Sequence, residues 1–364
     1  MRSPKKLGFI GGGLNSAVGY THYLASRMDG LFDVVAGCFS RDAQVNAETA
    51  HRFGVSEGRC YPSLDALMSA EKANLDAVCV LTPTPGHAGT VIDLLQRGFN
   101  VVCEKALATS FGEGQSIQVS LAQTGQKLMT TFNYVGYPMV REAQALISEG
   151  MIGEVQQIYC EMPQESFARK DTNPQDWRRN DYAIPCVSLD LGVHVCHLTQ
   201  FLLGGDDFAI LSAWEGTFGR VNGVIDTVSA TALHSERVLV NWMWGKAALG
   251  HTNGLKFRVF GDEGALEWSQ DVPDILFSVN ENGVRSRLER GQHGLRVASQ
   301  PRYNRFKAGH PAGFVEAFAN IYDDFHRELS LDSESAAASP FSASVAVNGL
   351  KILSRIHEIA KSAQ

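Results

Sequence analysis

The sequence lacks the features that define disulfide-rich, membrane and secreted proteins. Its 7 cysteines are scattered and odd in number, and none belongs to a CxxC pair, so we expect reduced thiols. No stretch approaches the roughly 18 consecutive apolar residues of a membrane span. The basic start of the chain is followed by too short an apolar run for a signal peptide. We therefore expect a cytoplasmic protein with no membrane partner.

A dominant basic stripe is also missing. The net charge is −7, and no expected element gathers enough lysine and arginine to bind nucleic acid. Hydrophobic residues make up 44% and charged residues 20% of the chain, which is typical of a folded globular protein. A chain of 364 residues is too long for one ordinary core, so we expect two domains.

The first part of the chain alternates short, continuously apolar runs with helical patterns. This alternation continues to about residue 133 and predicts a doubly wound parallel sheet, covered on both faces. We assign residues 1–135 to a domain of this kind, a Rossmann domain.

The pattern then changes to strand signals separated by turns. We assign residues 136–364 to an α+β domain with a large, mainly antiparallel open sheet. The C-terminal helix, 342–361, is a candidate to pack back on the first domain, and 334–340 resembles a connecting loop. The expected strands are 208–215, 225–233, 237–244, 255–260, 264–269 and 275–279.

A glycine-rich segment follows the first expected strand. Gly11 to Ser16 fits the G-x-G-x-x-G pattern, with Ser16 in place of the third glycine and with Leu14 and Asn15 before it. Gly11 would allow the tight turn, and Gly13 would let the backbone approach a pyrophosphate at the helix N-terminus. Such a loop is a weak signal alone. At the first βα junction of a βα series it predicts a dinucleotide site.

The end of the second expected strand bears on the choice between NAD and NADP. Ser40 and Arg41 occupy the place where a 2′-phosphate is received, and a guanidinium suits a phosphate. This slightly favours NADP. Two alternatives stay open: Ser40 caps the next helix with Arg41 in solvent, or Asp42 binds the ribose hydroxyls of NAD.

Several further motifs share one resemblance. In order along the chain they are Leu81-Thr-Pro-Thr-Pro-Gly-His87, Val101-Val-Cys-Glu-Lys-Ala106, Phe132-Asn-Tyr134, Asp176-Trp-Arg178 and Asp190-Leu-Gly-Val-His194-Val-Cys-His197. Together with the glycine loop they resemble the Gfo/Idh/MocA family, the glucose–fructose oxidoreductase, inositol dehydrogenase and MocA-like oxidoreductases. The matches cover residues 5–200, and the strand-rich remainder agrees with that family's C-terminal sheet.

The resemblance implies site residues, a class of substrate and an assembly. The substrate would be a sugar, polyol or nucleotide sugar, and the C-terminal sheet would pair subunits into a homodimer or homotetramer. One residue departs from the family pattern, because Ala106 stands where the family usually has proline. The loss of proline removes a backbone constraint next to the lysine. The cofactor contacts that the resemblance implies are Thr82, Pro83, His87, Glu104, Lys105, Asn133, Trp177 and Arg178.

The chemistry of alcohol oxidation points to catalytic residues within the same motifs. Oxidation of a secondary alcohol needs a base for the hydroxyl proton, and histidine suits that role. A cation stabilises the developing alkoxide, and Lys105 follows a buried strand where ligands of such folds bind. Asp190 and His194 are four residues apart and share a helix face. We predict Lys105, Asp190 and His194 as catalytic residues, with His197 and Glu161 as candidate substrate contacts.

Other interpretations stay open for these residues. Lys105 also fits a surface lysine, Asp190 a helix cap, and His194 or His197 a core histidine. Trp242 and Trp244 alternate along a strand and fit sheet packing better than a sugar platform. A non-catalytic dinucleotide sensor is the alternative function, followed by a metal-dependent hydrolase that uses the aspartate and histidines. We expect no metal, because a metal site leaves the glycine loop unexplained. The sequence does not identify the substrate or the direction of the reaction.

Overall fold

A computed structural model describes residues 3–307, 309–330 and 339–363 of the chain. It forms two compact units. The first comprises Met1–Ala108, Gly112–Asn133 and Phe314–Val347, and the second comprises Thr109–Phe111, Tyr134–Gly313 and Asn348–Gln364. The segment from 314 to 347, which we had placed in the second domain, therefore groups with the first unit. Residues 334–338 of the expected connecting loop lie outside the described residues.

The first unit is built on a parallel sheet of five strands in the order β2-β1-β3-β4-β5. Every strand pair is parallel, and the order changes direction between β1 and β3, the point at which such folds bind ligands. All five residues of β3 are buried, as expected for a sheet covered on both faces. The Rossmann prediction is confirmed. The strands are β1 (Lys5–Gly11), β2 (Phe32–Cys38), β3 (Ala77–Leu81), β4 (Val101–Cys103) and β5 (Leu128–Thr130).

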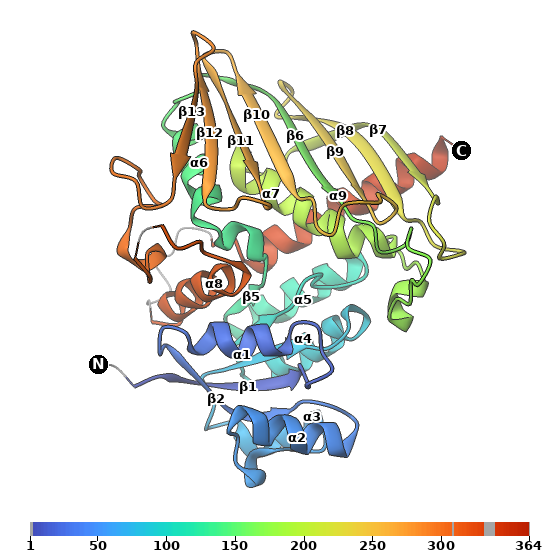
Figure 1. Ribbon diagram of the computed structural model, residues 1–364. Helices are drawn as coiled ribbons and strands as arrows, with labels where there is room; N and C mark the ends of the chain where they lie inside the picture. Colours follow the sequence, from blue (N-terminus) through green and yellow to red (C-terminus); the bar gives the residue numbers. More distant parts are fainter. Residues whose placement is uncertain (1–2, 308, 331–338, 364) are drawn as a thin grey trace. The chain divides into compact units, whose positions relative to one another are not determined.

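Helices cover this sheet on both sides. Figure 1 shows α1 on one side of β1 and β2, with α2 and α3 on the other, and α1 packs against α8. Helix α3 was not expected from the sequence; Ser63 caps it by accepting a hydrogen bond from the Ala66 N–H at 3.2 Å. The helical elements are α1 (Gly19–Arg27), α2 (Ala43–Phe53), η1 (Glu57–Arg59), α3 (Leu64–Glu71), η2 (Thr84–Gly86), α4 (His87–Gln96), α5 (Phe111–Thr124), η3 (Asn133–Gly136) and α8 (Phe314–Glu328).

The second unit contains a sheet of eight strands in the order β13-β12-β11-β10-β6-β9-β8-β7. Among the described strands of this second sheet, only the β6–β9 pair is parallel. The prediction of a mainly antiparallel sheet is therefore confirmed, and the sheet is a mixed one. Strand β13 was not expected, because its residues are almost all exposed and show no buried alternation. The strands are β6 (Val155–Pro163), β7 (Phe208–Gly216), β8 (Thr227–His234), β9 (Val238–Gly245), β10 (Lys256–Gly261), β11 (Gly264–Ser269), β12 (Ile275–Asn280) and β13 (Arg285–Glu289).

Helices of this unit lie against one face of its sheet (Figure 1). They are α6 (Pro138–Ser148), α7 (Val193–Leu203) and the C-terminal part of α9 (Ala343–Ser362), with shorter turns η4 (Asp176–Arg179), η5 (Ser188–Gly192) and η6 (Pro301–Tyr303). No helix in the described part of the chain is both long and apolar enough to cross a membrane.

The two tryptophans of β9 face these helices. Trp242 donates from Nε1 to Thr199 Oγ1 at 2.9 Å, and Trp244 donates to Ser188 Oγ at 3.1 Å. Both indoles are buried, so they serve sheet–helix packing, as the sequence favoured. The alternative of a sugar platform is wrong, since helices already cover this face of the sheet.

Candidate active site

The glycine loop connects β1 to α1. Gly11 has φ +76° and Gly12 has φ +75°, which confirms the tight turn expected at Gly11. The Gly13 N–H donates to the Phe39 carbonyl at 3.1 Å, and this bond fixes the loop against the end of β2. Leu14 is exposed, and its N–H donates to Thr49 Oγ1 at 3.1 Å.

The third glycine of the motif is not at the expected position. Helix α1 begins only at Gly19, and a Cβ there would lie 2.0 Å from the Gly12 carbonyl oxygen. Gly19 therefore provides the close helix–strand contact that we assigned to Ser16. Ser16 instead accepts hydrogen bonds on Oγ from the N–H groups of Val18 (3.3 Å) and Gly19 (3.2 Å). The loop is three residues longer than the motif predicts, as the helix start at residue 19 shows.

The end of β2 corrects the assignments around Arg41. Asp42, not Ser40, is the N-cap of α2, and its Oδ1 accepts from the Val45 N–H at 3.0 Å. Ser40 accepts from the Asp42 N–H at 3.1 Å. The hydrogen bond from the Val45 N–H occupies one carboxylate oxygen of Asp42. Fewer acceptor sites are then left for ribose hydroxyls, which weakens the alternative that Asp42 binds the ribose. Arg41 is exposed.

Two buried polar atoms at the C-terminal ends of the strands fit a bound dinucleotide. Thr82 Oγ1 follows β3 and Asn133 Nδ2 follows β5, and neither has a hydrogen-bond partner among the described residues. A buried donor or acceptor without a partner is costly, and a ligand at this edge of the sheet would satisfy both. With the glycine loop, these residues fit the expected cofactor.

His87 lies behind that edge, not on it. Its Nε2 is 2.6 Å from the Thr82 carbonyl oxygen and its Nδ1 is 2.7 Å from the Ala106 carbonyl oxygen. Burial lowers the pKa of His87 despite these bonds. The imidazole thus connects the loop after β3 to the segment after Lys105, and it constrains the backbone where Ala106 replaces proline.

Glu104 also faces the interior of the first unit. Its Oε1 lies 3.0 Å from His22 Nε2 and accepts from Thr131 Oγ1 at 2.5 Å. Burial would raise the pKa of Glu104, but His22 and its hydrogen bonds outweigh burial and lower it. The carboxylate therefore anchors the end of β4, directly before the half-buried Lys105. The expected cofactor contact of Glu104 stays a prediction; in the structure its carboxylate binds the side chains of His22 and Thr131.

In the second unit, Asp190 lies on a π-helical turn. The turn η5 (Ser188–Gly192) runs directly into α7, where we expected one continuous α-helix from 188 to 203. Single π-turns occur frequently at functional sites. Gly192 permits the close packing of this turn, because a Cβ there would lie 2.8 Å from Trp244 Cε2 and 2.9 Å from Leu353 Cδ2.

The Asp190 carboxylate binds two cations. Arg178 donates from Nε to Oδ2 at 2.9 Å and from Nη2 to Oδ1 at 3.3 Å. Lys246 Nζ lies 2.6 Å from Oδ2. Burial would lower the pKa of Arg178, but the Asp190 charge outweighs it and raises that pKa. Asp190 is therefore no helix cap, and Lys246 is a site residue that we did not predict.

His194 begins a second group of polar residues. Its ring meets the Tyr134 ring edge-on, with centroids 4.7 Å apart. Tyr134 accepts from Asn253 Nδ2 at 2.8 Å, and Gln164 donates to Asn253 Oδ1 at 3.1 Å. Burial raises the pKa of Tyr134, so its hydroxyl stays protonated. Tyr134 and Asn253 were not predicted, and no sequence spacing connects them.

Of the remaining predicted residues in the second unit, three lie near Asp190 or His194 and one does not. Arg178 and Trp177 belong to the Asp190 group, since the guanidinium lies 4.4 Å from the Trp177 ring centroid, and His197 is buried one turn after His194 on α7. Glu161 does not join them. It pairs with Lys256 at 2.6 Å and lies on the face of β6 opposite to the buried Cys160 and Met162.

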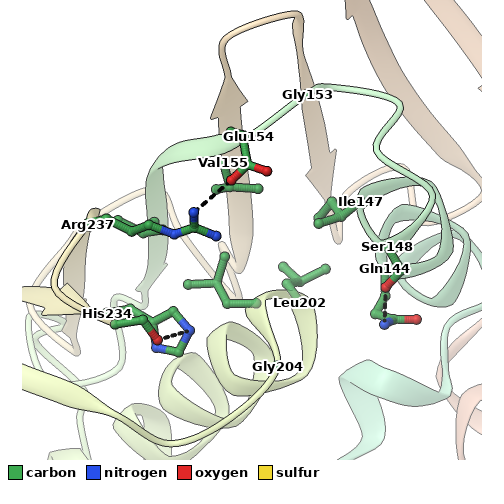
Figure 2. A pocket seen from close by; sticks show the side chains of 13 residues that line it. Gln144, Ile147, Ser148, Gly153, Glu154, Val155, Leu202, Gly204, His234 and Arg237 are labelled. Carbon is green, nitrogen blue, oxygen red and sulfur yellow. Dashed lines mark hydrogen bonds and ion pairs between the residues drawn. The ribbon is translucent and has the colours of Figure 1, made fainter.

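A cavity of about 400 Å³ opens at the C-terminal end of α7. Figure 2 shows Leu202 and Gly204 beside it, with Arg237 and Glu154 paired at its mouth. It contains none of the predicted site residues, and His194 lies at the other end of α7. Among the described residues, no group of three or more His, Cys, Asp or Glu side chains is arranged to hold a metal ion.

The fold and these residues define an oxidoreductase with a dinucleotide-binding unit and a sheet-rich second unit. A family model described as "Oxidoreductase family, NAD-binding Rossmann fold" matches residues 5–132. A second, "GFO/IDH/MocA C-terminal domain", matches residues 140–267. The chain belongs to the Gfo/Idh/MocA oxidoreductase family, as the resemblance predicted.

Known relatives agree over most of the chain. An uncharacterised oxidoreductase, YfiI, of Bacillus subtilis is 27% identical over 334 residues, covering 88% of this chain and 84% of the relative. Levoglucosan dehydrogenase of Pseudarthrobacter phenanthrenivorans is 24% identical over 300 residues, covering 74% and 75%. The structure of an inositol dehydrogenase homolog from Azotobacter vinelandii, complexed with NADH and myo-inositol, matches with a TM-score of 0.90 and 25% identity, covering 100% and 97%.

Proposed function

We propose that the protein transfers a hydride between a nicotinamide cofactor and a secondary hydroxyl or ketone of a sugar, polyol or nucleotide sugar. One observation carries the proposal: the Asp190 carboxylate, bound by Arg178 and Lys246, lies one helical turn before the buried His194. A carboxylate and an imidazole so placed are the parts of an acid–base site.

Each residue has a defined role in this proposal. His194 exchanges the proton of the reacting hydroxyl, because imidazole accepts and donates protons near neutral pH. Lys105 supplies a positive charge to the same oxygen, whose negative charge grows as the proton leaves. Asp190 orients and stabilises the charged imidazole. Bound NAD or NADP supplies the hydride acceptor or donor.

The class of substrate rests on the relatives. The two characterised examples above act on or bind levoglucosan and myo-inositol, both of which are polyhydroxylated rings. Gln164 and Asn253, which lie beside Tyr134, offer amide groups for neutral hydroxyls. We propose that this amide pair, not Glu161, contacts the substrate.

The glycine loop, Thr82 and Asn133 would hold the dinucleotide in the first unit. We keep the proposal that Arg41 and Ser40 favour NADP, because Arg41 is exposed at the end of β2 and a guanidinium binds a 2′-phosphate well. NAD is the alternative cofactor.

The test begins with a panel of sugars and polyols, followed by absorbance of the reduced nicotinamide with NAD and with NADP. On a working substrate, His194→Ala should lower kcat on the order of 10²-fold or more, and Lys105→Ala should lower it as well. NADH affinity, measured by fluorescence titration, should stay near that of the wild type, since neither role involves binding the adenosine.

Exposed residues provide the matched controls. His51→Ala and Lys72→Ala remove the same side chains from the first unit's surface and should leave kcat unchanged. A His194→Ala protein with normal kcat would show that His194 is not the base, and His197 would be tested next. A wild-type protein that binds NADH but turns over no substrate would favour the non-catalytic sensor.

A further inference from the structure

Lys246 is a buried lysine at the end of β9. Its backbone is fixed on both sides, because its N–H donates to the Asp226 carbonyl at 2.8 Å and its carbonyl accepts from the Phe167 N–H at 2.8 Å. Its ammonium lies 5.2 Å from the centroid of the Phe167 ring. The residue is only 5% exposed, and a buried ammonium is costly unless it is paired.

The position of Lys246 in the strand pattern makes its charge unusual. Along β9 the buried side chains are Val238, Val240, Trp242 and Trp244, at every second residue. Lys246, directly after the strand, is the next residue in this alternation and is also buried. An apolar residue there would continue the packing at lower desolvation cost, so the charge itself calls for an explanation.

A need of Asp190 for hydrogen-bond donors does not explain the charge of Lys246. Arg178 alone contacts both Asp190 oxygens, through Nε and Nη2. The Lys246 ammonium adds a further donor at 2.6 Å. Lys246 therefore adds a second cationic side chain to a carboxylate that Arg178 already binds through both oxygens.

We propose that Lys246 is a positioning residue of the active site, which fixes the Asp190 carboxylate on the turn before His194. The inference rests on the proposed function of Asp190 and His194. Lys246 directly follows β9, and its backbone is hydrogen-bonded on both sides, whereas Arg178 approaches from the short turn η4. The lysine therefore ties the carboxylate to the sheet, and its charge favours the negative charge that develops on a substrate oxygen.

The first test compares Lys246→Met with Lys256→Met. Both lysines lie 2.6 Å from a carboxylate in the same unit, but Lys256 pairs with Glu161 on the other face of the sheet. Lys246→Met should lower kcat on the order of 10-fold or more, with the KM for the cofactor unchanged. Lys256→Met should change neither. Lys246→Arg should recover part of the loss, because it keeps the charge but not the compact shape.

A purely structural role gives a different result. In that case Lys246→Met would lower the midpoint of thermal unfolding. The values of kcat and kcat/KM per folded molecule would stay at those of the wild type. That outcome overturns the proposal. Lys246→Gln provides a second, smaller replacement if the methionine variant does not fold.

A second test needs no substrate and so separates this inference from the proposed function. Asp190→Asn leaves Arg178 and Lys246 without their shared carboxylate, and two unneutralised cations destabilise a buried site. Adding Lys246→Met to Asp190→Asn should therefore restore part of the lost stability in urea unfolding of the protein without cofactor. If the free energies of unfolding lost in the two single variants simply add in the double variant, Lys246 and Asp190 do not interact, and the proposal is overturned. Failure of the proposed function would appear instead as a wild-type protein without turnover.

Discussion

The imidazole of His22 and the carboxylate of Glu104 form an ion pair in the interior of the first unit, with Nε2 and Oε1 3.0 Å apart. His22 lies on α1, the helix that follows the glycine loop, and Glu104 directly precedes Lys105. Tyr322 on α8 contacts the other ring nitrogen at 2.8 Å. The pair therefore connects the expected phosphate-binding helix to the strand end that carries the proposed catalytic lysine.

This pair predicts a stability that depends on pH. Burial would lower the pKa of His22, but Cys79 and Glu104 outweigh it and raise the pKa from 6.5 to about 9. The unfolded chain loses this proton at lower pH than the folded protein. The contribution is therefore complete below pH 6.5 and lost as the pH rises to about 9. Its size is on the order of 3 kcal/mol.

Urea unfolding of the wild type and of His22→Gln checks this prediction. The difference in unfolding free energy between the two proteins should be largest below pH 6.5 and should shrink as the pH rises to about 9. Other titrating groups cancel in that difference. A constant difference over this range would mean that His22 is not charged in the folded protein.

The Gly19 contact predicts a sensitive position that the motif did not mark. Gly19→Ala places a Cβ 2.0 Å from the Gly12 carbonyl oxygen, so α1 must move, at a cost of about 1–3 kcal/mol. NADH binding should weaken as well, because the helix N-terminus moves. Gly89→Ala is the control, since it lies in helix α4 of the same unit with open space around its Cβ, and alanine there should stabilise slightly. Unchanged NADH affinity in Gly19→Ala would contradict this account.

The fold was largely predictable, because hydrophobic period identifies long elements well. The continuously apolar runs gave the parallel strands, and alternation gave most of the second sheet. The two missed elements lacked these signals: β13 is almost fully exposed, and α3 is a helix of only eight residues. The parallel β6–β9 pair could not be predicted, because strand order depends on packing between distant segments.

The site was predictable where a motif carries its chemistry, and less so elsewhere. Lys105, Asp190 and His194 lie in motifs, but Lys246, which binds Asp190, comes from a distant part of the chain. The same holds for His22, which binds Glu104, and for Asn253, which binds Tyr134. Period-2 alternation did contain two unused signals. Lys246 continues the buried face of β9, and Glu161 lies out of phase with the buried residues of β6. The first pointed to a buried charge, and the second placed Glu161 on the opposite face of the sheet from Cys160 and Met162.

Arg41 predicts the cofactor preference. If its guanidinium meets a 2′-phosphate, Arg41→Ala should weaken NADP binding by about 1.5–3 kcal/mol, the value of a charge-assisted hydrogen bond. NAD binding should hardly change. Arg52→Ala, an exposed arginine on the same helix region, is the control and should affect neither cofactor. Equal wild-type titration curves for NAD and NADP would contradict a role for Arg41.

The open face of the eight-stranded sheet predicts the assembly. Tyr159 and Phe260 meet edge-on there, with centroids 6.1 Å apart, and Phe260 is 36% exposed. Apolar and aromatic side chains on a broad sheet face are typical of a subunit contact. We expect a homodimer or homotetramer, so light scattering at micromolar concentration should give a multiple of 39.6 kDa.

Phe260→Glu should shift the mass toward the monomer, because a carboxylate buried in the contact lacks a partner. Phe306→Glu changes an equally large ring that is 56% exposed outside the sheet and should leave the mass unchanged. A wild-type mass of a single chain would contradict the proposed contact, and an unchanged mass for Phe260→Glu would place the contact elsewhere.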